Sequence, residues 1–215
     1  LLGRRHSLPY ETIAQADAQR TLEKARVTVP KHVTGDLATL ANHADIQHGL
    51  FVIKSTGVAH KSEVGGVTLS LTNGDAVRQA GAKMSSATFI LEEMIADPVA
   101  EILIGVVKDP AHGFVITIGA GGLFAELLKD TASILMPASR DHFKRTLNRL
   151  KFSKIFNGYR NQPAGNIDAL LDAVEAIQSY VLANLDTIEE VEVNPFILTQ
   201  TRAVAADALI RKRND

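Results

Sequence analysis

The sequence predicts an α+β fold with two subdomains, because two patterns agree. Stretches in which apolar residues recur at helical spacing alternate with short β-prone runs, and turn signals such as Asn73-Gly74 join them. The chain also closes with a β-hairpin. Helices in alternation with hairpins favour α+β over a doubly wound parallel fold. We expect the 215 residues to divide near Glu92, into subdomains of residues 1–92 and 93–215.

Apolar spacing and turn residues give the order of the elements. In the first half we expect a helix over 10–26, a short strand at 27–29, a helix capped by Asp36, strands at 51–54 and 67–71, and a helix capped by Asp75. In the second half we expect β-rich runs at 88–95, 100–108 and 113–119, helices near 139–150 and 166–185, and a hairpin of 188–196 with 203–210. The three β-rich runs should form one sheet with hairpin connections.

Composition excludes several classes of protein. The chain has 23 Lys and Arg against 24 Asp and Glu, a formal net charge of −1, which argues against a general nucleic-acid or membrane-surface protein. Cysteine is absent, so disulfides, thiolate zinc sites and cysteine nucleophiles are excluded, and a cytoplasmic location is expected. The longest uncharged apolar run, 113–125, is too short and glycine-rich to span a bilayer. The chain opens without Met, which suggests a piece of a longer polypeptide.

The stretch 51–67, FVIKSTGVAHKSEVGGV, has the chemistry of a phosphate-binding loop. Strand alternation places Lys54 on the face opposite Phe51 and Ile53. The loop after it offers positive charge, a hydroxyl and unobstructed backbone N–H groups, from His60, Lys61, Ser62, Gly65 and Gly66. This mixture suits a polyphosphate, although the glycine spacing is not that of the common P-loop. The alternative is an exposed basic hairpin loop.

The final hairpin predicts a metal site. Alternation puts Glu192 and Asn194 on the face opposite Val191 and Val193. A turn centred between residues 200 and 201 pairs Asn194 directly with Asp207. Oxygen ligands on such opposed residues could hold one Mg²⁺ that keeps waters for phosphate oxygens. The alternative is an ordinary polar sheet face.

Two further segments carry unexpected residues. Glu92 and Glu93 stand within an apolar β-rich run, where they could accept hydrogen bonds from an adenine amino group or a ribose hydroxyl, or lie on the solvent side of an edge strand. The glycine-rich segment 119–122 is followed by Glu126 and Asp130. It is either a flexible backbone loop or a tight sheet corner.

Taken in order, these segments resemble one family. The motifs are a strand lysine at Lys54, HK-S/T-x-x-GGV at 60–67, D-P-x-x-G at 109–113, G-x-GG-x-x-x-E-x-x-x-D at 119–130 and acid-x-N-P at 192–195. The chain thus resembles the ATP-grasp domain, or β subunit, of the NDP-forming acyl-CoA synthetases, relatives of succinyl-CoA synthetase, over about residues 10–210. It departs from that pattern at Asn161, where Arg160 is usually followed by glycine, which leaves the local loop geometry open.

The resemblance implies an ATP-grasp fold with ATP or ADP bound between two subdomains. Lys54 and Lys61 would contact the phosphates, and Glu192 would support the Mg²⁺ ligands Asn194 and Asp207. The implied nucleotide-binding residues are Lys54, Ser62, Gly65, Gly66, Glu92, Glu93, Met94, Ile95 and Glu101. Either His60 accepts the phosphoryl group transiently, which we hypothesise, or it hydrogen-bonds to the phosphate or the partner.

The implied reaction requires a partner. In this family a phosphohistidine on a CoA-binding domain or subunit carries the phosphoryl group between acyl phosphate and ADP, and this chain lacks that domain. We expect the partner to dock near the glycine-rich segment 119–122. Two alternatives are a nucleotide-sensing regulatory module fused to an acyltransferase, and a carboxylate–amine ligase, which would need an amine site in this chain. The sequence leaves the acyl substrate and the choice between adenine and guanine open.

Overall fold

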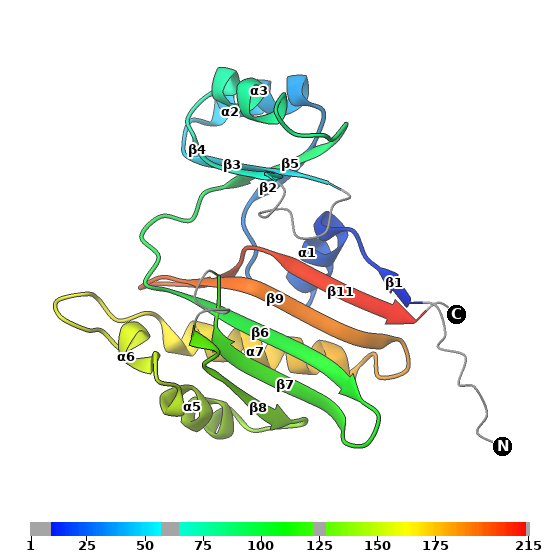
Figure 1. Ribbon diagram of the computed structural model, residues 1–215, viewed down its shortest axis with the longest axis vertical. Coiled ribbons are helices and arrows are strands. Elements are labelled where there is room, and N and C mark those ends of the chain that lie inside the picture. Colours follow the sequence, from blue (N-terminus) through cyan, green and yellow to red (C-terminus); the bar gives the residue numbers. More distant parts are fainter. Residues whose placement is uncertain (1–9, 57–64, 123–127, 214–215) are drawn as a thin grey trace. The chain divides into compact units, whose positions relative to one another are not determined.

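The structure is a computed structural model that describes residues 10–56, 65–122 and 128–213 (Figure 1). The chain forms two compact units, a large unit of Leu1–Val29 with Asp97–Asp215 and a small unit of Pro30–Ala96. The bounds of these units differ from the predicted division, since the N-terminal residues join the large unit. They do so because strand β1 (Tyr10–Thr12) pairs with β11 (Ala208–Arg213) at the far end of the sequence.

The small unit is a sheet with two helices on one face (Figure 1). Its described strands lie in the antiparallel order β2-β5-β3-β4. Their bounds, with those of the helices, are β2 His32–Gly35, α2 Leu37–Gln47, β3 Phe51–Ser55, β4 Val67–Leu71, α3 Gly74–Gly81 and β5 Phe89–Glu93. Asp36 caps α2 as predicted, with its carboxylate accepting from Thr39 N at 2.8 Å. The cap of α3 is Asn73, not Asp75, so that helix begins two residues earlier than expected.

The large unit is an antiparallel sheet backed by helices. Its described strands follow the order β1-β11-β9-β6-β7-β8, with β10 also paired to β9. The remaining bounds are α1 Gln15–Lys24, β6 Ala100–Asp109, β7 Gly113–Ala120, β8 Thr131–Leu135, α5 Arg140–Arg149, α6 Ser153–Phe156, α7 Ile167–Leu182, β9 Ile188–Leu198 and β10 Ala203–Ala205. Alternate residues such as Ile104, Ile118 and Val193 point into a core shared with α5 and α7. The other face carries polar residues such as Glu192 and Thr117 together with exposed apolar residues such as Leu135.

Several further expectations about elements were wrong. The run that contains β5 joins the sheet of the small unit, because β5 pairs with β2 and β3 and the chain turns away at Asp97, whose φ is 51°. Residues 27–29 form no strand: Thr28 O accepts one bond from Ala205 N, and Pro30 has no N–H with which to continue a ladder. The strand expected at 203–210 is interrupted between β10 and β11. Strands β1, β2 and β8 and helix α6 were not predicted, and the first residues of the helix expected over 10–26 form β1 instead.

No helix in the described part of the chain has both the length and the apolar character needed to cross a membrane. Among the described helices α7 is the longest, with 16 residues. Six of its residues are buried, and their spacing along the helix makes one apolar stripe that packs on the sheet: Leu170, Leu171, Ala173, Val174, Ile177 and Val181. Helix α7 is therefore a core helix of the large unit.

Asn161 occupies a backbone conformation that explains its departure from the family pattern. Its φ is 65°, within the left-handed region that glycine adopts freely and that asparagine tolerates better than most other residues. Arg160 before it also has a positive φ, 47°, and its guanidinium carbon lies 5.2 Å from the ring centre of Tyr159. Asparagine thus fits the left-handed geometry that glycine in the family pattern would allow.

We predict that Asn161→Gly leaves the free energy of unfolding within about 0.5 kcal/mol of the parent value, whereas Asn161→Val lowers it by about 1–2 kcal/mol. The β-branched side chain clashes with its own backbone at a positive φ, and glycine does not. Urea unfolding followed by circular dichroism measures both. Equal effects of the two variants would contradict the conformational explanation.

Candidate functional site

Lys54 and Glu92 form a buried ion pair in the small unit. Strands β3 and β5 pair so that Val52 lies opposite Glu92 and Lys54 opposite Ile90. Lys54 and Glu92 are therefore diagonal neighbours on one face of the sheet, within reach of long side chains. Lys54 Nζ lies 2.7 Å from Glu92 Oε2, and the two residues are 7% and 2% exposed. Each charge is the counter-charge of the other in a region that water hardly reaches.

The predicted orientation of Lys54 is confirmed. Phe51 and Ile53 pack into the core under α2 and α3, and Lys54 points to the opposite face. The ion pair itself was not foreseen, because it depends on pairing between strands that are more than thirty residues apart. The idea that Glu92 lies on the solvent side of an edge strand is wrong, since β5 lies between β2 and β3.

The ends of the predicted phosphate loop are fixed by backbone hydrogen bonds. Ser55 N donates to Gly66 O at 2.8 Å, and Thr56 N donates to Thr88 O at 3.2 Å. Gly65 has a φ of 71° and open space where a side chain would begin, so its backbone is accessible. The side chains of His60, Lys61 and Ser62 lie outside the described residues. The loop therefore starts directly beyond Lys54, at the end of β3.

Glu93, Met94 and Ile95 lead out of β5. Glu93 exchanges backbone and side-chain bonds with Lys31: its N–H donates to Lys31 O at 2.9 Å, and its Oε1 accepts from Lys31 N at 3.4 Å. Met94 N donates to Leu50 O at 2.8 Å. Glu93 and Met94 are half-buried, and Ile95 is buried. These bonds hold the segment along the end of the small unit's sheet.

The predicted register of the final hairpin is confirmed. Ala205 pairs with Phe196 and Ala208 with Val193, which places the centre of the turn between residues 200 and 201. Asn194 N donates to Asp207 O at 3.2 Å, so these two residues oppose each other as expected. Val191 and Val193 are buried, whereas Glu192 and Asn194 are half-buried on the other face.

Oxygen atoms of the hairpin are held by backbone donors. Asn194 Oδ1 accepts from Gly122 N at 2.9 Å, and Asp207 Oδ1 accepts from Ala208 N at 3.0 Å. An amide oxygen and carboxylates are the donors that Mg²⁺ takes, and each oxygen has a second lone pair. In the described chain no three His, Cys, Asp or Glu residues are grouped to hold a metal by themselves. The donor chemistry of Glu192, Asn194 and Asp207 nevertheless fits a magnesium ion that keeps part of its water shell.

The glycine-rich segment 119–122 contains the end of β7 and packs closely against its neighbours. A Cβ on Gly121 would lie 2.6 Å from the Ile102 backbone, and one on Gly122 would fall on the Glu101 carboxylate. Gly121 N also donates to Glu101 O at 2.8 Å. Gly122 thus lies between Glu101 of β6 and Asn194 of the hairpin. Glu126 lies outside the described residues.

Burial of the Glu101 carboxyl against this segment raises its pKa above the ordinary value for glutamate. The residue as a whole remains exposed. The raised pKa therefore reflects the contact of the carboxyl with the segment around Gly122 and not burial of the whole residue. The folded state therefore binds a proton at Glu101 more tightly than the unfolded state does.

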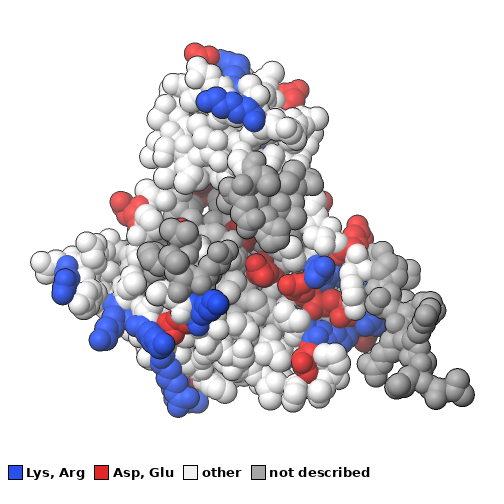
Figure 2. Space-filling view, in the orientation of Figure 1, with Lys and Arg blue, Asp and Glu red and all other residues white. Residues whose placement is uncertain are grey.

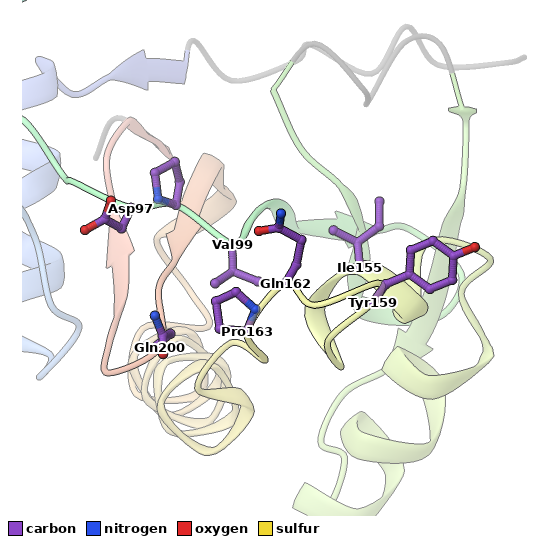
Figure 3. A pocket seen from close by; sticks show the side chains of 8 residues that line it. Asp97, Val99, Ile155, Tyr159, Gln162, Pro163 and Gln200 are labelled. Carbon is purple, nitrogen blue, oxygen red and sulfur yellow. The ribbon is translucent and has the colours of Figure 1, made fainter.

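Two hollows are lined by residues other than the ion pair and the proposed metal ligands. Figure 3 shows one in the large unit, with a volume of about 680 Å³, whose lining residues include Asp97, Tyr159, Gln162 and Gln200. The other, of about 440 Å³, lies in the small unit and includes Glu93 and Met94. Neither is lined by Lys54, Glu92 or Asn194.

Figure 2 shows acidic and basic side chains mixed near the ends of β9 and β11, where Arg213 pairs with Glu189 at 2.7 Å.

A model of the ATP-grasp domain matches residues 10–211, nearly the whole chain. The chain belongs to the ATP-grasp domain family. Among curated proteins, this ATP-grasp domain is 29% identical over 213 residues to the ADP-forming acetate–CoA ligase II of Archaeoglobus fulgidus, covering 94% of the chain and 31% of that protein. It is also 29% identical to the β subunit of the ADP-forming acetate–CoA ligase I of Pyrococcus furiosus, covering 73% of the chain and 71% of the subunit. The chain therefore spans about a third of the Archaeoglobus relative.

Solved structures share the fold of this ATP-grasp domain. Acetyl-coenzyme A synthetase 1 of Ca. Korarchaeum cryptofilum, in complex with coenzyme A and Ca-AMPCP, superposes with a TM-score of 0.83 at 23% identity, covering 94% of each chain. The same enzyme with Mg-AMPPCP, its phosphohistidine segment pointing towards the nucleotide binding site, gives a TM-score of 0.80 and covers 94% and 93% of the two chains. At this identity the likeness establishes the fold.

We predict that Lys54→Met and Glu92→Gln each lower the free energy of unfolding by about 3–5 kcal/mol, because each removes the counter-charge of a buried charge. The double variant should lose much less than the sum of the two, since it removes both charges. Urea unfolding of the four proteins measures this coupling. Asp75→Asn, which removes an exposed carboxylate 2.7 Å from Arg78, serves as the control and should cost about 0–1 kcal/mol. Additive losses would contradict the pairing.

Glu101→Gln should raise the melting temperature near pH 8 and leave it unchanged near pH 3. Because the folded-state pKa of Glu101 is raised, its contribution to stability is fully present below the unfolded pKa, about 4.3, and is lost as the pH rises through the folded value. Glutamine, which does not ionise, removes that loss. Melting curves across this range measure the difference, with Glu23→Gln on the exposed face of α1 as the control. A pH-independent shift would contradict the assignment.

Proposed function

We propose that this ATP-grasp domain binds ATP or ADP with Mg²⁺ and performs the phosphoryl-transfer step of an NDP-forming acyl-CoA synthetase. The overall reaction converts acyl-CoA, ADP and phosphate into a carboxylic acid, ATP and CoA, and runs in both directions. The observation that carries the proposal is the opposition of Asn194 and Asp207 on the polar face of β9, in a chain of this family. That pair supplies the anionic and amide oxygens that a nucleotide-bound magnesium requires.

The chemistry asks the protein mainly for charge neutralisation and alignment. Phosphoryl transfer spreads negative charge over the oxygens of the transferred group. We assign that neutralisation to the ammonium groups of Lys54 and Lys61, a hydroxyl contact to Ser62, and close backbone approach to Gly65 and Gly66. When bound, Mg²⁺ would neutralise phosphate oxygens, with Asn194 and Asp207 as its ligands and Glu192 in support.

The remaining proposed contacts surround the base and the ribose. Glu93, Met94 and Ile95 would contact the base through side chain and backbone, and Glu101 would reach the ribose. We keep both proposed roles for His60, transient acceptance of the phosphoryl group and hydrogen bonding to the phosphate or the partner. Detection of labelled phosphohistidine on His60 after incubation with Mg-ATP would favour the first, and its absence the second.

We propose that a CoA-binding component supplies the phosphohistidine. The support is that relatives are named ADP-forming acetate–CoA ligases; this chain covers 31% of one of them, and another is a separate β subunit. In the Korarchaeum structure a phosphohistidine segment points towards the nucleotide binding site. Docking of the partner near residues 119–122 and a cytoplasmic location remain predictions from the sequence.

The test is nucleotide binding by the whole chain, measured by calorimetry with and without Mg²⁺. We expect Mg²⁺-dependent binding of ATP or ADP, weakened about tenfold or more by Lys54→Ala, because a charge-assisted contact to phosphate is lost. Asp207→Ala should remove most of the Mg²⁺ dependence and leave metal-free binding unchanged. Glu190→Gln, on the same strand as Asn194 and paired at 3.0 Å with Arg211, is the matched control. Absence of Mg²⁺-dependent binding in the parent chain would overturn the proposed function.

A further inference from the structure

We infer that Glu92 is a positioning residue for Lys54 and not a contact to the nucleotide base. This inference rests on the proposed function and changes the role that the family resemblance gives to Glu92. It concerns the small unit alone, where both residues lie on paired strands. Three observations carry it: the strand position of Glu92, its burial, and its contact with the ammonium group of Lys54.

The strand geometry separates Glu92 from Glu93. Successive residues of a strand point to opposite faces of the sheet. Glu92 shares a face with Lys54, whereas Glu93 lies on the other face and bonds to Lys31. Both side chains therefore cannot line the same base pocket from within β5.

Glu92 is buried on the sheet face opposite the one that α2 and α3 cover. The residue is 2% exposed, and β5 is flanked on both sides, with His32 and Val52 paired to it at this position. A carboxylate that accepts a hydrogen bond from an entering base must present an oxygen to the ligand. Oε2 of Glu92 instead lies 2.7 Å from Lys54 Nζ. The carboxylate is thus directed at the lysine.

Lys54 needs such a partner in order to act on phosphate. A buried ammonium group without a counter-charge is costly, and its four-carbon side chain has many rotamers. The ion pair keeps the charge and fixes the side chain at the end of β3, next to the start of the predicted phosphate loop. An ammonium group has three donors, so it can bond a carboxylate and a phosphate oxygen together. Glu92 therefore acts on the nucleotide through Lys54.

The experiment compares three probes by calorimetry in the presence of Mg²⁺: ATP; ITP, which carries an oxygen in place of the 6-amino group; and tripolyphosphate, which has no base. Glu92→Gln should weaken the binding of all three by the same factor, about tenfold. The ratio of ATP to ITP affinity should stay unchanged. The number of probe molecules bound per chain should also stay unchanged. A variant that was partly misfolded would bind fewer probe molecules per chain. Asp75→Asn should alter none of these values.

Each other outcome overturns the inference. A loss confined to ATP would identify Glu92 as a contact to the adenine amino group. A gain for all probes would show that Glu92 competes with phosphate for Lys54, and no change would show that the pair is unimportant for binding. Should Glu92→Gln fail to fold, Glu92→Asp keeps the charge on a shorter side chain and should give a smaller loss, again equal for the three probes. Failure of the parent chain to bind any probe would instead count against the proposed function.

Discussion

Antiparallel strand register is the constraint on which both candidate sites depend. In the small unit, the alignment of β3 with β5 brings Lys54 and Glu92 together on the face away from α2 and α3. In the large unit, the alignment of β9 with the returning chain opposes Asn194 and Asp207. A slip of one residue would turn each set to the other face and bury charges among the apolar residues of the core. The apolar alternation that builds each core therefore also fixes the polar pairs.

The sequence predicted those features that depend on short stretches of chain. The hairpin register follows from a single turn between residues 200 and 201, and the orientation of Lys54 follows from strand alternation. Pairings between distant segments could not be predicted in this way. Strand β5 was assigned to the wrong sheet, and its pairing with β3, which creates the ion pair, is made across the intervening strand β4 and helix α3. Likewise, no local signal shows that β1 pairs with β11.

Backbone conformation explains which residues of a motif can change. Asn161 replaces glycine in the family pattern and keeps a φ of 65°, which asparagine can adopt. At Gly121 the constraint is space and not φ, because a Cβ would lie 2.6 Å from the backbone of Ile102, which cannot move aside as a flexible side chain can. A motif glycine required only for its φ can thus be replaced by asparagine, whereas one required for its lack of a side chain cannot. The sequence alone does not distinguish these two cases.

The polar groups of both units are already held by protein partners without a ligand. Asn194 and Asp207 each accept a backbone N–H, and Lys54 is bound by Glu92. Groups fixed in this way lose less conformational entropy when a ligand binds, which leaves more of the interaction energy for affinity. Their partners also restrict where the donors and acceptors can point, in the same way that hydrogen-bond partners orient the residues that ligate a metal ion. The arrangement of each candidate site therefore depends on a residue that holds its functional groups in place, Glu92 in the small unit and Gly122 in the large unit.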